Sequence, residues 1–503
     1  MSNKSTKGIW KVISASSMGT MIEWYDFYIF GSLAVVISTK FFPSDNPTAA
    51  FLSTLATFAA GFVVRPFGAL FFGRLGDIIG RKYTFMATLL LMGGATFLIG
   101  CVPSYETIGF FAPLLVLILR LLQGLALGGE YGGAATYVAE HAPVGERGYW
   151  TSWIQTTATV GLFISLMVIL ATKNILSPEE FDNWGWRVPF WISIVMVFVS
   201  YLIRKNMDES PVFAKAKKEG KTSSNPLKDS FGNKYNLKFV LLALFGATMG
   251  QGVVWYTGQF YAMNFMKTVM TIDSSQVDEL LGIALVFGTP FFIFFGWLSD
   301  KIGRKYIMLA GMLLAILFYR PIYKTMYQTT LLSNKVEIPG KTKTLVELKE
   351  KKRHTVDSIF TLSKVFTDGT VYHEIKTVPL DKERTAEVKS TITINSSDKW
   401  ILIFMVFIQV LFVAMVYGPI AAFLVEMFPA KIRYTSMSLP YHVGNGIFGG
   451  LLPAISTYFV INGKEAGDAE YYLEGLWYPI IIASVCFIIG MIYIDNTNKN
   501  KHI

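Results

Sequence analysis

Two acidic residues and one arginine stand inside stretches apolar enough to cross a membrane. Glu23 and Asp26 are three residues apart, so on a helix they lie on nearly the same face. Glu23 and Arg120 each lie roughly 16 Å into their apolar runs at the helical rise per residue. Ionisable groups at this depth are costly and are functional candidates. We predict a carboxylate–guanidinium pair that protonation would break, with a permanent ion pair between two helices as the alternative.

For each of two further charged residues, the sequence allows two functional interpretations. Glu130 follows two glycines and lies about 15 Å nearer the cytoplasm than Arg120. It is a second proton site or gate, or a helix-end charge that reaches Arg74 or Arg81. Arg65, near the middle of another apolar run, holds a substrate carboxylate or pairs with one of the two acids near the N-terminus.

Neutral polar and aromatic residues recur at helical spacing later in the chain. Such groups suit a small polar solute, and the aromatic rings also suit a quaternary ammonium ion. His442 either titrates near neutral pH or is a hydrogen-bonded structural residue. The candidate substrate-binding residues are Tyr28, Arg65, Arg120, Gln251, Trp255, Tyr256, Gln259, His442 and Asn445.

The elements that position these residues follow from the composition. Of 503 residues, 52% are hydrophobic and 16% charged, and the mean hydropathy is +0.44, which indicates a polytopic membrane protein. Helices are the only reasonable assignment for long runs in a bilayer. Twelve runs are long enough, over residues 12–39, 51–72, 83–102, 108–133, 149–172, 187–204, 238–267, 276–298, 306–325, 400–425, 435–461 and 476–494.

The net charge of +10 is concentrated in short loops between the runs. This pattern is explained better by the positive-inside rule than by a nucleic-acid surface, and it places both chain ends in the cytoplasm. The two cysteines, Cys101 and Cys486, fall in apolar runs, so neither a disulfide framework nor a zinc site is expected. The chain has no phosphate-binding glycine loop and no His-Glu-x-x-His pair.

A short charged turn occurs twice, over residues 73–82 and 296–305, each time between two apolar runs. Two copies at matching places indicate an internally duplicated membrane protein. The candidate gating residues in these turns are Gly73, Asp77, Arg81, Lys82, Asp300, Arg304 and Lys305.

This repeated turn resembles the loop signature of the major facilitator superfamily. Further stretches resemble motifs of its metabolite:proton symporter family, which includes permeases for 2-oxoglutarate, citrate, shikimate, and proline or betaine; they are Gly19–Phe27, Arg65–Gly68, Arg120–Gly124 with Gly128–Glu130, Gly185–Phe190 and Glu426–Pro429. The resemblance covers nearly the whole chain. It implies two six-helix bundles, proton-driven uptake by alternating access and a site between the halves. It places Glu23, Asp26, Arg120 and Glu130 where coupling and binding groups would lie.

The domain boundaries follow from these runs. We predict an N-terminal six-helix bundle over residues 1–204, a cytoplasmic linker over 205–237 and a C-terminal bundle over 238–503. Residues 327–399 interrupt the second bundle as an insert outside the cell, with alternating stretches that predict short β-strands and a polar turn over residues 395–398. The insert is a β cap or a partner-docking module, or else a tolerated insertion.

The expected function is inward symport of a small carboxylated metabolite with protons, by a multi-pass protein of the cell inner membrane that works as a monomer. No cofactor other than the proton is expected, and no nucleic acid. One alternative is uptake of a zwitterionic osmolyte such as proline or betaine. A non-transporting receptor on the same fold is another, against which the charged residues in the spans argue. The sequence offers no convincing nucleophile–base pair, which argues against an enzyme.

Overall fold

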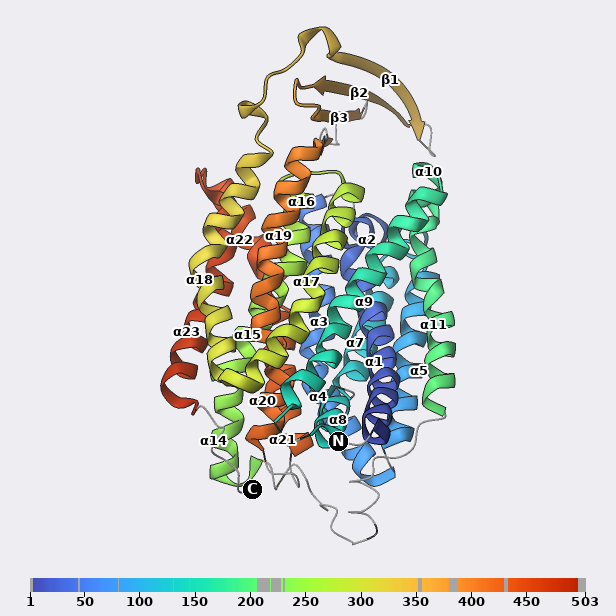
Figure 1. The fold of residues 1–503 in the computed structure, drawn as a ribbon. Coiled ribbons are helices and arrows are strands. Elements are labelled where there is room, and N and C mark those ends of the chain that lie inside the picture. Colours follow the sequence, from blue (N-terminus) through green and yellow to red (C-terminus); the bar gives the residue numbers. More distant parts are fainter. Residues whose placement is uncertain are drawn as a thin grey trace.

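The computed structural model describes residues 3–43, 46–79, 81–129, 131–143, 145–205, 218, 228, 231–351, 355–379, 387–428 and 433–495. We call residues 3–205 the first half and residues 231–495 the second half. Long helices run side by side through one bundle, and both chain ends lie at the end opposite the β-sheet (Figure 1). We call the end with the chain ends the inner end and the end with the sheet the outer end.

The first half consists of helices only in its described part. They are α1 (Asn3–Ser32), α2 (Ala34–Phe41), α3 (Pro47–Val63), α4 (Arg65–Ile79), α5 (Arg81–Cys101), α6 (Tyr105–Ile108), α7 (Phe111–Gly128), α8 (Tyr131–His141), α9 (Arg147–Ile175), α10 (Pro178–Asn183), η1 (Gly185–Arg187) and α11 (Val188–Lys205).

The second half combines helices with one small sheet. Its helices are α14 (Lys234–Ala243), η2 (Leu244–Thr248), α15 (Met249–Tyr256), η3 (Thr257–Tyr261), α16 (Ala262–Thr268), α17 (Ser274–Ile302), α18 (Arg304–Thr329), η4 (Leu332–Asn334), η5 (Pro339–Lys341), α19 (Ser396–Tyr417), α20 (Ile420–Met427), α21 (Arg433–Val443), η6 (Gly444–Gly449), α22 (Leu452–Glu465), η7 (Tyr471–Leu476) and α23 (Trp477–Tyr493).

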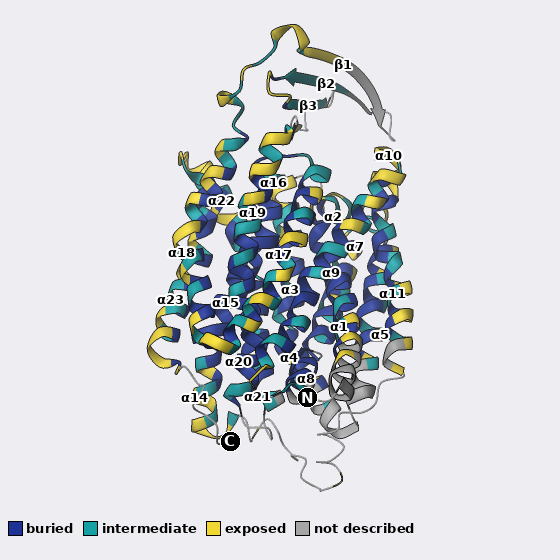
Figure 2. Ribbon diagram, viewed as in Figure 1, coloured by how far each residue is buried: buried dark blue, intermediate teal, exposed yellow. Residues whose placement is uncertain are grey.

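Each of the twelve predicted runs forms helix. Among the described residues, 10 helices are long and apolar enough to cross a membrane, and the pair formed by residues 17–32 and 34–41 makes one more. The remaining predicted run holds the shorter apolar helix Met86–Cys101. The predicted helical membrane fold with a small β insert is therefore confirmed. Buried residues fill the middle of the bundle, while exposed residues follow the outward faces of α11, α18 and α23 (Figure 2).

Among the described residues, one span of the first half is bent and another is interrupted in its helical hydrogen bonding where they meet the second half. The first span bends by 62° between residues 32 and 34. Just before this bend, a Cβ built on Gly31 would lie 2.3 Å from a ring carbon of Phe260, so only glycine permits this approach. The second span continues from Pro47 to Phe72, but its helical hydrogen bonding is interrupted at Val64. Pro66 contributes to that break because it has no amide hydrogen to donate to the carbonyl of Phe62.

Three segments of the second half are π-helical: η2, η3 and η6. Two of them face the first half, because Phe260 of η3 packs on Phe58, with ring centroids 5.1 Å apart, and Gly446 of η6 approaches Phe62. Segments of this kind are frequent at functional sites.

The insert forms a four-stranded antiparallel meander of order β1-β2-β3-β4. The strands are β1 (Lys343–Lys351), β2 (Thr355–Val365), β3 (Val371–Pro379) and β4 (Glu387–Thr393), and Phe360 of β2 pairs with Lys376 of β3. The polar turn predicted over residues 395–398 is instead the start of α19, because the side chain of Asn395 accepts a hydrogen bond from the amide of Asp398 and caps the helix. The predicted linker, residues 205–237, lies mostly outside the described residues.

Candidate functional site

Arg65 is the first residue of α4, directly after the break in the second span. Its side chain is fully buried, and its guanidinium carbon lies 4.9, 4.7 and 4.0 Å from the ring centroids of Trp24, Phe27 and Phe62. A Cβ built on Gly446 of the second half would be 3.8 Å from its Cδ, so Arg65 lies where the halves meet. Within the described residues, Nε and Nη2 have no hydrogen-bond partner. A buried guanidinium with unused donors is suited to a carboxylate.

An aromatic stack crosses the interface beside this arginine. Tyr28 of α1 stacks on Trp24, with ring centroids 5.0 Å apart and an interplanar angle of 17°. On its other side it stacks on Trp255 of α15, at 5.3 Å and 15°. Phe260 lies 5.4 Å from the same tyrosine. The two predicted contacts Tyr28 and Trp255 therefore meet, one from each half.

The remaining candidates on the seventh span also face the first half. Tyr256 packs edge-on against Phe62, with centroids 5.1 Å apart. The amide of Gln259 donates to the hydroxyl of Thr159 over 3.4 Å. In the part of the chain that the structure describes, its Oε1 and the indole nitrogen of Trp255 have no hydrogen-bond partner. These atoms can bind a polar solute at the interface.

Two of the predicted substrate-binding residues form hydrogen bonds with each other instead. Gln251 and Asn445 exchange amide hydrogen bonds of 3.0 and 2.8 Å, which tie α15 to η6. His442 is buried, and neither of its ring nitrogens has a hydrogen-bond partner among the described residues. Its ring lies edge-on to Tyr131 of the first half, at a centroid distance of 6.4 Å. The reading of His442 as a hydrogen-bonded structural residue is therefore wrong for this structure.

Arg120 of α7 is as deeply buried as Arg65, but both of its terminal nitrogens are used, and only Nε has no hydrogen-bond partner among the described residues. Nη1 donates to the carbonyl of Phe27 over 3.2 Å and to Oε1 of Gln123 over 2.6 Å. Nη2 donates to the carbonyl of Phe58 over 3.3 Å. Gln123 in turn donates to Thr96 of α5 over 2.6 Å. The side chain thus links α1, α3 and α7.

Asp26 lies on another side of α1. A Cβ built on Gly93 of α5 would be 3.3 Å from its Oδ2 and 1.7 Å from Val197 of α11, so the carboxyl group faces α5 and α11. It is fully buried, and within the described ranges neither oxygen has a hydrogen-bond partner. Asp26 therefore does not pair with Arg120, because the rotation of α1 turns this acid away from α7. Glu23, one turn earlier, is also buried.

A tyrosine network toward the inner end was not predicted from the sequence. Tyr131 of α8 stacks on Tyr441 of α21, with centroids 3.5 Å apart and an interplanar angle of 4°. Gln155 donates to the hydroxyl of Tyr131 over 2.8 Å and to the carbonyl of Tyr417 over 3.2 Å. The hydroxyls of Tyr417 and Tyr441 are 2.8 Å apart. The sequence feature that could have indicated this network is Gln155, an amide side chain in the middle of an apolar run.

Asp300 of the second repeated turn reaches the first half. Its two carboxylate oxygens accept the backbone amides of Gly148 and Tyr149, each over 2.8 Å. These amides lie in the first turn of α9, where a carboxylate is favoured. Arg304 lies 2.6 Å from Asp300 and 3.0 Å from Glu426. We call the bonds from Asp300 to the first turn of α9 the inner latch.

Close helix packing supports the inner latch. A Cβ on Gly148 would lie 2.4 Å from the carbonyl oxygen of Gly296, and one on Gly296 would lie 2.6 Å from the carbonyl oxygen of Gly148. Two glycines therefore let α9 and α17 approach at the inner end. Lys305 instead donates to the carbonyl of Met491 within the second half, over 2.8 Å.

A matching contact closes the outer end and was not predicted. Asp278 of α17 is buried and pairs with Lys267 of α16 at 2.5 Å and with Lys173 of α9 at 3.2 Å. Lys173 also donates to Ser274 over 3.2 Å. We call the contacts of Lys173 with Asp278 and Ser274 the outer latch. The signal for it was an acid near the start of an apolar run.

Some predicted residues fall outside what the structure describes. Glu130 is one of them, and for Gly73, Asp77, Arg81 and Lys82 only the helical backbone of α4 and α5 is described. Among the described residues, no group of three or more His, Cys, Asp or Glu side chains is placed to hold a metal ion.

Comparisons with known proteins agree with this geometry. Residues 11–235 match the family model described as "Sugar (and other) transporter". The chain is 31% identical over 477 residues to the inner membrane metabolite transport protein YhjE of Escherichia coli (strain K12), covering 93% of this chain and 91% of that protein. It is 29% identical over 492 residues to the alpha-ketoglutarate permease of the same strain, covering 97% and 94%.

A third relative is named for a substrate other than alpha-ketoglutarate. The chain is 27% identical over 502 residues to the proline/betaine transporter of Salmonella typhimurium, covering 97% of this chain and 84% of that protein. Among solved structures, the proton:xylose symporter XylE of the major facilitator superfamily, bound to 6-bromo-6-deoxy-D-glucose, superposes with a TM-score of 0.66 at 15% identity, covering 97% of this chain and 95% of that one.

Proposed function

Because the chain belongs to the major facilitator superfamily, among its metabolite transporters, we propose that it takes up a small carboxylated metabolite together with protons. Transport proceeds by alternating access, with the substrate bound between the halves. The protein is a multi-pass protein of the inner membrane, and both chain ends and the inner latch face the cytoplasm. The two bundles, residues 1–204 and 238–503, move against each other as a monomer.

The observation that supports this proposal most is the unused hydrogen-bonding capacity of the buried Arg65 side chain. Its guanidinium group is buried at the interface, and Nε and Nη2 have no hydrogen-bond partner within the described residues. Leaving such donors unpaired in a low-dielectric site is costly, so a ligand that accepts both is strongly favoured. A carboxylate does so with two parallel hydrogen bonds and also neutralises the charge. The alpha-ketoglutarate permease among the relatives is named for such a substrate.

The aromatic stack favours a second candidate, a zwitterion such as proline or betaine. Trp24, Tyr28 and Trp255 present stacked rings beside Arg65. Aromatic faces attract quaternary ammonium groups, while the arginine would still bind the carboxylate of such a solute. The proline/betaine transporter is also among the relatives.

Asp26 is the group that we propose to carry the coupling proton. An ionised carboxylate without a partner is costly inside a membrane protein, so the closed arrangement suits the neutral acid. Ionisation would favour a rearrangement of α1 that hydrates or pairs the carboxylate, which links the proton to the open state. Glu23 and Glu130 remain further candidates for the same role.

The two latches support alternating access. Helices α9 and α17 run antiparallel, with the inner latch at Asp300 and the outer latch at Asp278. Each latch joins the two halves. Opening the bundle toward one side must break the latch at that end, while the other latch keeps the opposite side closed.

Purified protein in proteoliposomes tests both candidates. Under an imposed inward proton gradient, we expect accumulation of labelled dicarboxylates such as 2-oxoglutarate, and no accumulation when the gradient is collapsed by a protonophore. Accumulation of proline or betaine, but of no carboxylate without an ammonium group, would replace the first candidate with the second. Uptake that ignores the proton gradient would remove proton coupling. The control is Lys399→Ala, at a partly exposed position on α19.

A further inference from the structure

The insert is attached to the turn that carries the outer latch. The amide of Ile392, in β4, donates to the carbonyl of Thr271 over 2.8 Å, and the amide of Asp273 donates to the carbonyl of Ile392 over 2.9 Å. Gln276 holds the next residues of the insert, because its side-chain amide exchanges bonds of 2.8 and 3.1 Å with the backbone of Ile394. Strand β4 thus binds the short segment between α16 and α17.

The backbone of this segment is strained. Thr271 has a φ of +52° and is the only residue other than glycine with a positive φ in the described part of the chain. This left-handed region is disfavoured for L-residues, and for a β-branched side chain it is a clear outlier. The carbonyl that β4 binds is that of Thr271 itself. The strain is therefore maintained where the insert is attached.

The same segment sets the geometry of the outer latch. It joins Lys267, near the end of α16, to Asp278, in the second turn of α17. These two side chains pair at 2.5 Å, and Lys173 reaches Asp278 and Ser274 from the first half, each over 3.2 Å. A change in the turn would therefore move the acceptors of Lys173.

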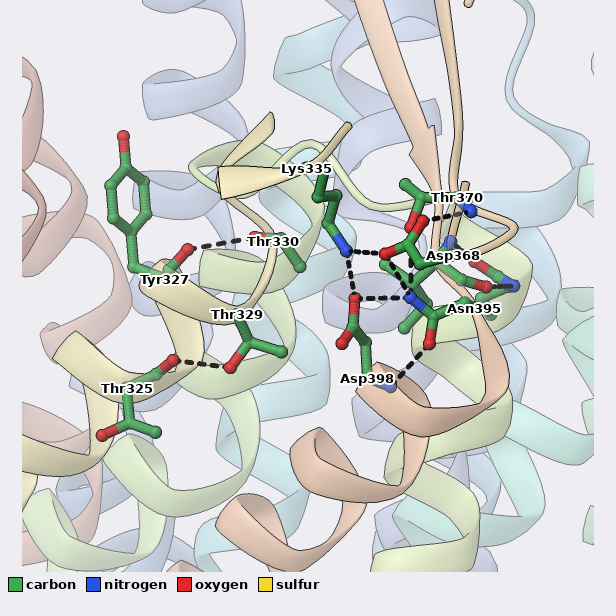
Figure 3. Close-up of polar contacts among 11 residues, drawn as sticks. Thr325, Tyr327, Thr329, Thr330, Lys335, Asp368, Thr370, Asn395 and Asp398 are labelled. Atoms are coloured by element: carbon green, nitrogen blue, oxygen red, sulfur yellow. Dashed lines mark hydrogen bonds and ion pairs between the residues drawn. The ribbon is translucent and has the colours of Figure 1, made fainter. Parts of the chain in front are cut away.

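The insert itself is fixed to the second half. Lys335, before the sheet, lies 2.5 Å from both Asp368, between β2 and β3, and Asp398 of α19 (Figure 3). Asn395 donates to both carboxylates, over 2.8 and 2.9 Å. In the described ranges, the hydrogen bonds that leave the insert all end on the second half. We call Lys335, Asp368, Asn395 and Asp398 the clasp.

From these contacts we infer that the insert is a clamp on the outer gate: it holds the α16–α17 turn in its strained form and so aligns Asp278 and Ser274 for Lys173. Releasing β4 lets Thr271 leave the left-handed region, which weakens the outer latch and favours the state open to the outside. The inference rests on the proposed function only in that the outer ends of the two halves separate during the cycle.

Distance measurements between spin labels test the clamp without any substrate. Labels at Ile175→Cys of α9 and Glu465→Cys of α22 report the separation of the outer ends, in a Cys101→Ser background because Cys101 is exposed whereas Cys486 is buried. We expect Gln276→Ala to raise the fraction of the longer distance several-fold over the unaltered protein. The matched control, Lys399→Ala, removes an ion pair with Glu279 of the same helix α17 and leaves the distances unchanged.

The decisive comparison uses the backbone strain at Thr271. Glycine adopts the left-handed region readily, so in a Thr271→Gly protein the turn keeps its form without the clamp, and adding Gln276→Ala should change the distances far less. Asp278→Asn opens the outer end directly and serves as the positive control. Distances unchanged by Gln276→Ala would overturn the clamp, and an equal opening in both backgrounds would overturn the role of Thr271. Because no solute is involved, failure of the proposed uptake would leave these outcomes unaffected.

Discussion

Arg65 and Arg120 are two buried arginines that differ in how many of their hydrogen-bond donors are used. Both side chains are fully buried, and both guanidinium groups lie over rings that include Phe27. Arg120 donates to two backbone carbonyls and to Gln123 and leaves only Nε without a partner, whereas both Nε and Nη2 of Arg65 have no partner within the described residues. Burial alone therefore does not reveal the role of a charged residue. A satisfied charge fastens helices, and an unsatisfied one is available to a ligand or a proton.

The largest effect is expected at Asp26, whose carboxyl oxygens have no hydrogen-bond partner among the described residues. Asp26→Asn keeps the volume of the side chain but cannot release a proton, so proton-driven accumulation should be abolished while exchange of labelled for unlabelled solute continues. Uptake by proteoliposomes with and without a pH gradient measures both. Full accumulation in this variant would remove Asp26 from the coupling step. Thermal stability is expected to stay at the level of the unaltered protein.

The next effect concerns the ligand at Arg65. Arg65→Lys keeps a positive charge but loses the planar pair of donors. We expect the KM for the carboxylated solute to rise about tenfold or more, since tenfold corresponds to about 1.4 kcal/mol of binding free energy. Initial uptake rates over a range of concentrations give the KM. An unchanged KM would mean that the substrate carboxylate binds elsewhere.

An effect on stability, and not on transport, separates the two arginines directly. Arg120→Met leaves Gln123 without its donor and unfastens α7 from α1 and α3, which should cost about 1–3 kcal/mol of unfolding free energy. The matched variant Arg65→Met removes no hydrogen bond between described residues and should cost less. The midpoint of thermal unfolding in detergent ranks the two. A greater loss of stability in Arg65→Met would contradict the comparison.

The smallest effect is expected at the clasp, whose charges are paired. Burial raises the pKa of Asp368, but the hydrogen bonds from Lys335 and Thr370 outweigh it and hold the pKa below its ordinary value. Burial lowers the pKa of Lys335, and the bonds to Asp368 and Asp398 raise it above its ordinary value. The acid thus stabilises the clasp above its unfolded pKa of about 3.9, and the lysine does so below about 10.4.

Attachment of the insert should therefore be constant between about pH 5 and pH 9, and it should weaken as the pH falls below about 4 or rises above about 10. Hydrogen exchange of the β4 amides, corrected for the intrinsic rates, measures it. A change in protection near neutral pH would show that another titrating group controls the clamp.

The sequence was informative about elements and weak about orientation. Apolar length located every helical span, and alternation located β3 and β4, because both patterns follow from local geometry. The rotation of α1 about its axis depends on packing against α5 and α11, so the direction of Asp26 could not be read from its spacing to Glu23. The bend before α2 likewise depends on the contact of Gly31 with Phe260 of the second half, whereas Pro66 is a local signal for the interruption at Val64.

The candidate site shows the same division. Arg65, Tyr28 and Trp255 were predicted and meet at the interface. Gln251 and Asn445 were predicted for the same reason, their polarity in apolar runs, yet they bind each other. Lys173 and Asp278 were not predicted, because a charged residue near the end of a span is ordinarily interpreted as marking the orientation of the span in the membrane. Pairing across the chain decides these cases, and it is a property of the folded molecule.

The inner latch has a consequence for which changes the protein tolerates. Its donors are main-chain amides of residues 148 and 149, and no exchange of side chains other than one to proline can delete them. The vulnerability on that face is one of bulk, since anything larger than hydrogen at position 148 would collide with Gly296. Variation at residue 149 other than to proline should therefore be harmless to the gate, whereas a single added methyl group at residue 148 would hold the two halves apart.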